Sequence, residues 1–196
     1  MSATVGLWEH FRRLASFHGR EDRSSFWPYA AVAFALVTFS GVVTVIPMAA
    51  RMMRSMQGYA MQHPDEVLVT SAPGQYSMSV NGGPAGLMPS PDFIALYLAM
   101  TVGLGIVLYA AAVARRLHDC GRSGAWGLMP LPFILYSSIQ FPRLFGMMAR
   151  GAEPGVTTLL SIALSNALYL LAVVVLIVLL AGASDPQPNR YDRSVG

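Results

Sequence analysis

Residues 157–183 read TTLLSIALSNALYLLAVVVLIVLLAGA and contain no charged side chain. A helix rises 1.5 Å per residue and the hydrocarbon core of a bilayer is about 30 Å thick, so about 20 apolar residues cross it. Two further uncharged stretches are long enough: 28–50, PYAAVAFALVTFSGVVTVIPMAA, and 93–114, FIALYLAMTVGLGIVLYAAAVA. These three stretches predict three membrane-spanning helices.

The composition of the whole chain supports the same class. Of its 196 residues, 54% are apolar and only 12% are charged, whereas a soluble domain carries about 25% charged residues. A single cysteine, Cys120, excludes an intrachain disulfide and a multi-cysteine metal site. All 13 basic residues are arginines that flank apolar stretches, which favours a membrane surface over nucleic acid as the partner. We expect no metal and no other cofactor.

A fourth span is harder to recognise. Residues 123–142 are uncharged but contain Pro130 and Pro132, which remove backbone donors and strain a helix. We interpret 125–139 as a short, kinked span, with a re-entrant hairpin as the alternative. The segment 51–92 contains several prolines and a Gly-Gly pair, so we predict a loop there and a second loop at 140–156.

The placement of arginine predicts the orientation, because short arginine-rich segments stay in the cytoplasm. With four spans, the segments 1–27, 115–124 and 184–196 lie on one side and hold nine arginines, and the two loops hold four. A re-entrant third segment would change this ratio to seven against six. The count favours four spans at 28–50, 93–114, 125–139 and 157–183, with both termini in the cytoplasm and the two loops in the periplasm.

A short amphipathic pattern precedes the first span. Apolar residues recur at helical spacing opposite charged ones: Leu7, Trp8, Phe11, Leu14 and Ala15 against Glu9, Arg12 and Arg13. The pattern predicts an interfacial helix, with packing on the cytoplasmic ends of the spans as the alternative; Trp27 and Tyr29 would then lie in the aromatic belt. The expected fold class is all-α, an integral membrane four-helix bundle with an N-terminal amphipathic interfacial helix.

Three polar strings fall on the predicted cytoplasmic side: FHGREDRSSFW (17–27), RRLHDCGRSGAW (115–126) and NRY (189–191). They resemble the DUF 805 family (domain of unknown function 805) of bacterial inner-membrane proteins, whose pattern is F-x-G-R-x-x-R-x-x-[FY]-W, then R-R-L-H-D-x-x-R-S-G-x-W, then N-R-Y-G. Asp192 stands where that family has the last glycine, and the two outer loops look like insertions. The resemblance implies an inner-membrane location and brings no established activity.

These strings supply the candidate site residues. The candidates for binding an anion, a lipid headgroup or a partner are Arg20, Arg23, Arg115, Arg116, His118, Asp119, Arg122, Ser123, Asn189, Arg190 and Tyr191. Asp119 can reach Arg116 if the helix continues, and Ser123 suits the N-cap of the third span, where backbone amides would attract an anion. Alternatively, Asp119, Glu21, Asp22 and the arginines form a belt of salt bridges that holds the helix ends in register.

An enzyme is not expected. His118 and Asp119 are adjacent, so on a helix they point about 100° apart, and no nucleophile motif accompanies them; we predict no catalytic residue. The spans contain no Asp, Glu, Arg or His, although proton-coupled transport needs such groups. The sequence therefore predicts a non-enzymatic membrane component whose arginine-rich face binds anionic phospholipid headgroups or a membrane-protein partner, including a homo-oligomer. The alternative is an oligomeric small-solute channel or transporter.

Overall fold

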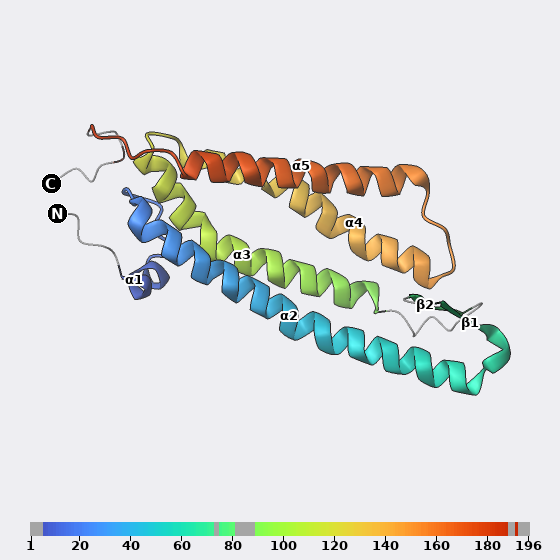
Figure 1. The fold of residues 1–196 in the computed structure, drawn as a ribbon. Coiled ribbons are helices and arrows are strands. Elements are labelled where there is room, and N and C mark those ends of the chain that lie inside the picture. The colour runs from blue at the N-terminus through green and yellow to red at the C-terminus, as the bar shows by residue number, and fades with distance from the viewer. Residues whose placement is uncertain (1–5, 73–74, 81–88, 188–190, 192–196) are drawn as a thin grey trace.

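The computed structural model describes residues 6–72, 75–80, 89–187 and 191. Four long helices dominate it and run in alternating directions (Figure 1). They are α2 (Arg23–Gln62), α3 (Pro91–Asp119), α4 (Leu131–Ala149) and α5 (Val156–Leu180). The shorter elements are α1 (Leu7–Arg12), η1 (Pro64–Glu66), β1 (Val67–Ala72), β2 (Gln75–Val80) and η3 (Gly124–Leu128).

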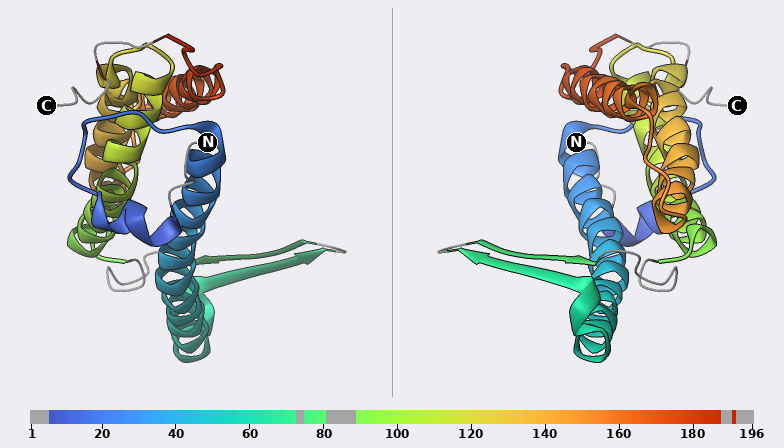
Figure 2. Two further views of the ribbon diagram at one scale, coloured as in Figure 1. Left: turned by 90° about the vertical axis from the view of Figure 1, so that its left-hand side faces the viewer. Right: turned by 90° about the vertical axis from the view of Figure 1, so that its right-hand side faces the viewer.

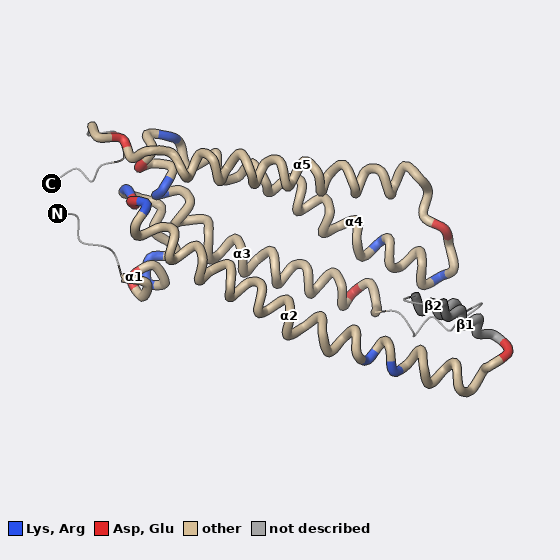
Figure 3. The backbone as a smooth tube through the Cα atoms, in the orientation of Figure 1, with Lys and Arg blue, Asp and Glu red and all other residues tan. Residues whose placement is uncertain are grey.

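Three of these helices, α2, α3 and α5, are long and apolar enough to cross a membrane. Charged residues gather near the two ends of the helices, and the stretches between them are uncharged (Figure 3). The chain is therefore a helical membrane protein with at least three candidate spans.

The first long helix differs from its predicted bounds. It begins at Arg23, where the Asp22 carboxylate accepts a hydrogen bond from the Ser25 N–H at 3.0 Å as an N-cap, and it continues to Gln62. The prediction of a loop over the whole of 51–92 is wrong, because residues 51–62 are helical and 67–72 pair with 75–80 as an antiparallel hairpin. The helix continues because its Ala, Met, Arg and Gln residues all have high helix propensity.

The prolines of the third helix mark its beginning. Pro130 is the N-cap of α4 and Pro132 lies in its first turn, where the missing N–H groups would have no helical partner anyway. The expected kink at these prolines is therefore wrong, and α4 extends to Ala149 through residues predicted as a loop. Ahead of α4, the 3₁₀ helix η3 packs closely on α3: a Cβ added at Gly124 would lie 3.0 Å from the Ala114 Cβ.

The buried core lies where α2 begins and α3 and α5 end, which we call the arginine-rich end. It contains Phe26, Tyr29, Leu108, Leu117 and Leu180. The Tyr29 hydroxyl donates to the Leu108 carbonyl at 2.7 Å, so its predicted place in an aromatic belt is wrong, whereas Trp27 is exposed. Away from this end, the long helices pack mainly on their neighbours in sequence and leave their outer faces exposed.

The N-terminal helix is shorter than the predicted pattern. Its apolar residues divide between two environments: Phe11 packs edge-on against Tyr29, at 5.6 Å between ring centroids, while Leu7 and Trp8 are exposed. Figure 2 shows α1 lying across the direction of the long helices. The segment is thus anchored to the core on one side and open on the other.

Candidate functional site

The arginine-rich end brings together the three polar strings. The Arg20 Nε lies 3.2 Å from the Asp119 Oδ1, and the His118 Nδ1 lies 3.4 Å from the Gly19 carbonyl oxygen. The His118 ring also stacks on Tyr191, with centroids 3.8 Å apart. The first two strings and the last residue of the third therefore meet; Asn189 and Arg190 lie outside the described residues.

A polar cluster occupies the interior of this end; we define it as His10, Arg20, Glu21, Arg115, Arg116 and Asp119. Glu21 lies between two of its members and is 5% exposed. Its Oε2 accepts from the Arg115 Nε at 2.8 Å, and its Oε1 lies 2.7 Å from the His10 Nε2. Arg115 also donates to the carbonyls of Arg13 and Ser16. One arginine of α3 thus holds the segment between α1 and α2.

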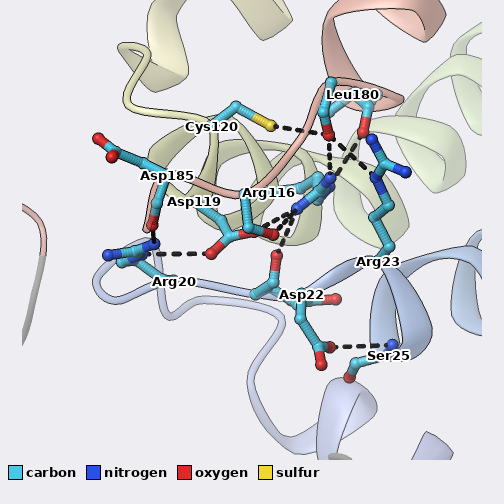
Figure 4. A network of polar contacts seen from close by, with 12 residues as sticks. Arg20, Asp22, Arg23, Ser25, Arg116, Asp119, Cys120, Leu180 and Asp185 are labelled. Atoms are coloured by element: carbon cyan, nitrogen blue, oxygen red, sulfur yellow. Dashed lines mark hydrogen bonds and ion pairs between the residues drawn. The ribbon is translucent and has the colours of Figure 1, made fainter. Parts of the chain in front are cut away.

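Arg116 is the most enclosed charge among the described residues, with no exposed side-chain surface. Its Nε donates to the Leu180 carbonyl at 3.0 Å and its Nη2 to the Gly182 carbonyl at 2.7 Å. Its Nη1 pairs with the Asp119 carboxylate, as the sequence predicts (Figure 4). Buried charges are tolerated when they are paired and hydrogen-bonded in this way.

The end of α5 is capped by the guanidinium groups of Arg23 and Arg116. The last carbonyls of a helix have no partner within it, and α5 has no basic residue in its last turn. Arg23, from the first turn of α2, donates to the Gly182 carbonyl at 3.0 Å and to the Ala181 carbonyl. Together with Arg116 it caps α5 and ties it to α2 and α3 (Figure 4).

The geometry distinguishes the predicted roles. Arg115 and Arg116 direct their donors at protein groups, as the salt-bridge alternative requires. Arg122, in contrast, is exposed. The Ser123 hydroxyl accepts from the Ala125 N–H at 3.3 Å, so it caps the five-residue η3 and not, as predicted, the spanning helix that follows.

The sequence predicts Glu21 only as a member of the alternative belt of salt bridges, and it gives no sign of His10. His10 lies eleven residues before Glu21 in an unrelated pattern. Only the turn between α1 and α2 brings them together, so no spacing rule could find the pair.

The remaining reactive groups near this end have structural contacts. Asp119 bonds to Arg20 and Arg116, while His118 lies against Gly19 and Tyr191. The Cys120 Sγ is 3.8 Å from the Gly182 carbonyl oxygen, and burial raises the pKa of the Cys120 thiol. Within the described ranges, no group of three or more His, Cys, Asp or Glu side chains is arranged to hold a metal ion.

Apolar helices of spanning length, joined at one end by a buried network of charges, define this chain as a helical integral membrane protein. The family model described as "Protein of unknown function (DUF805)" matches residues 14–193. The chain therefore belongs to the DUF805 family. Comparisons with curated proteins and with solved structures give no match.

Proposed function

We propose that this chain is a four-span protein of the bacterial inner membrane with both termini in the cytoplasm. The ends of α3 and α5 support an even number of crossings, because the Asp185 N–H donates to the Asp119 carbonyl at 2.8 Å. Two spans that end on the same side require the chain between them to return across the bilayer. The returning segment is η3 followed by α4.

The dimensions of the returning segment agree with a crossing. The 19 residues of α4 correspond to about 28 Å at 1.5 Å per residue, close to the hydrocarbon thickness of about 30 Å. The positive-inside rule then assigns the arginine-rich end to the cytoplasm. Arg143, within α4, would lie toward the periplasmic side.

We further propose a non-enzymatic role in which the arginine-rich end binds anionic lipid headgroups. The observation that carries this proposal is the exposure of all three tryptophans of the chain at that end: Trp8 at 74%, Trp27 at 38% and Trp126 at 48%. Tryptophan prefers the depth of the headgroups. The exposed side chains of Arg12 and Arg122 accompany them and would meet the anionic surface.

The candidate residues then divide into two groups. Arg115, Arg116 and Asp119 are buried and bonded within the chain, so we assign them to the scaffold that holds the binding surface. Arg12 and Arg122 are assigned to the headgroups.

Lipid retention tests this assignment. The full chain is reconstituted in nanodiscs of phosphatidylcholine with and without phosphatidylglycerol, and bound lipids are counted by native mass spectrometry. An arginine near an anionic surface contributes about 1 kcal/mol, so Arg12→Gln with Arg122→Gln should weaken retention of phosphatidylglycerol by roughly 10- to 30-fold. The double substitution to Lys preserves the charge and should retain the lipid.

Equal retention by the wild type and the Gln variant would contradict headgroup binding. A protein co-purifying in an Arg122-dependent manner would support a partner instead, and solute flux through the reconstituted chain would support a channel. The orientation is tested separately by a compartment-sensitive reporter after the last residue, since a periplasmic signal excludes the four-span arrangement.

A further inference from the structure

One polar side chain of α5 lies deep in the proposed membrane region. Asn166 is the eleventh residue of the 25 in α5, which puts it about 15 Å from the start of the helix and about 21 Å from its end. It is partly buried, and its neighbours in sequence Leu164, Ala167 and Leu168 are exposed. A carboxamide therefore lies near the middle of a helix that is long and apolar enough to span the membrane.

The hydrogen-bonding capacity of Asn166 is mostly unused. Within the part of the chain that the structure describes, it makes one hydrogen bond, from its Nδ2 to the Ile162 carbonyl of the same helix at 2.9 Å. A carboxamide has a second N–H donor and a carbonyl oxygen that accepts two hydrogen bonds. In contrast, the Ser165 hydroxyl donates to the Phe133 carbonyl of α4 at 3.0 Å. Lipid tails cannot satisfy the remaining groups of Asn166.

A stripe along α5 surrounds this side chain. The residues at spacings of three or four that include Asn166 lie on one face of the helix. Most of the others on this stripe are exposed, namely Leu159, Ala163, Leu170 and Ile177, whereas Val173 is partly buried. This alternating spacing is the one by which paired helices interlock side chains, and an asparagine in such a stripe sets the register of the pair. The small Ala163, one turn before Asn166, allows close approach of a second helix.

We propose that two copies of this chain associate within the membrane along α5, with the Asn166 carboxamide of each copy hydrogen-bonding to that of the other. A carboxamide is self-complementary, because its N–H groups carry positive and its oxygen negative partial charge. A two-fold axis through the stripe brings the same residue of both copies together, so each copy supplies the partner that the other lacks. The proposal does not depend on headgroup binding at the arginine-rich end.

Cysteine crosslinking of the full chain in native membranes tests the interface. Cys120 is the only cysteine of the chain, so Cys120→Ser provides a cysteine-free background. Ala163→Cys reports on the stripe, and Leu164→Cys is the matched control, because it is also exposed at nearly the same depth but about 100° around the helix. Oxidation should give a disulfide-linked dimer at position 163 and much less at 164.

The contribution of Asn166 is tested in the same background. Hydrogen bonds between membrane helices contribute modestly, so Asn166→Leu should raise the dimer dissociation constant in bicelles by about three- to tenfold, and Asn166→Gln should retain the dimer. Equal crosslinking at 163 and 164, or crosslinking at 163 only to a different protein, would overturn the proposal. Unchanged dimerisation of the Asn166→Leu chain would overturn the assigned role of the carboxamide.

Discussion

Replacing Arg116 by glutamine is the most direct test of the polar cluster. The substitution removes the donors to the carbonyls of Leu180 and Gly182 and leaves the buried Asp119 without its closest cation. Breaking a buried ion pair by removing one partner costs about 3–5 kcal/mol. Arg20 remains 3.2 Å from the Asp119 Oδ1, so we expect a loss near the lower limit, about 3 kcal/mol.

The loss can be measured as the free energy of unfolding in mixed micelles titrated with dodecyl sulfate. Tryptophan fluorescence is a suitable signal, because all three tryptophans lie at the arginine-rich end. Arg122→Gln is the matched control: Arg122 belongs to the same string but is exposed, and its loss should cost less than about 0.5 kcal/mol. Arg116→Lys keeps the charge without the planar fork and should lie between the two. A cost below about 1 kcal/mol for Arg116→Gln, typical of a surface pair, would refute the reasoning.

Three further predictions concern neighbouring features. Gly124→Val should destabilise the protein by about 1–3 kcal/mol, because a Cβ at this position meets α3 at 3.0 Å. Gly103→Ala is the control and should not destabilise it in this way, because a Cβ there meets nothing within 4 Å. Equal losses of stability in thermal unfolding of the two variants would contradict the close packing of η3. Burial raises the pKa of the Cys120 thiol, so less thiolate is present at neutral pH. Maleimide should therefore label Cys120 more slowly at pH 7 than it labels a control cysteine placed at the exposed Ala183 in a Cys120→Ser chain. The labelling rate of Cys120 should still rise with pH where the rate of the control cysteine has levelled off. His10→Ala removes a hydrogen-bond partner of Glu21, which should destabilise the docking of α1 by about 1–2 kcal/mol. If α1 detaches and returns faster than trypsin cleaves it, cleavage near α1 should become roughly tenfold faster. An unchanged cleavage rate would show that His10 does not hold α1.

The three apolar stretches are predictable because they depend on local composition. The stretches 28–50, 93–114 and 157–183 each lie almost wholly within a helix that the structure makes long and apolar enough to span. The ends of the helices are less predictable. The prolines and the Gly-Gly pair that predicted a loop lie beyond Gln62, and α2 continues up to that residue because most residues of 51–62 have high helix propensity. The pairing of 67–72 with 75–80 depends on contacts between two separate segments, which the composition of either segment does not predict.

In the candidate site too, local contacts could be predicted from the sequence and contacts between distant segments could not. The RRLHD string identifies Arg115, Arg116 and Asp119, and the helical spacing of three correctly predicts the pair between the last two. The spacing does not reveal that Arg115 turns toward Glu21, 94 residues earlier, or that Arg116 caps α5, 64 residues later. The two adjacent arginines look equivalent in sequence to the exposed Arg122, yet burial gives them a structural role.

The sequence by itself thus determined that this is a membrane protein, where its three long apolar helices lie and the family to which it belongs. Hydrophobicity and short strings are properties of neighbouring residues. Only the tertiary structure decided which arginines are enclosed and which stay exposed. An arginine is buried at little cost only where carboxylates and helix-end carbonyls meet its donors, and in this chain those acceptors come from segments far apart in the sequence.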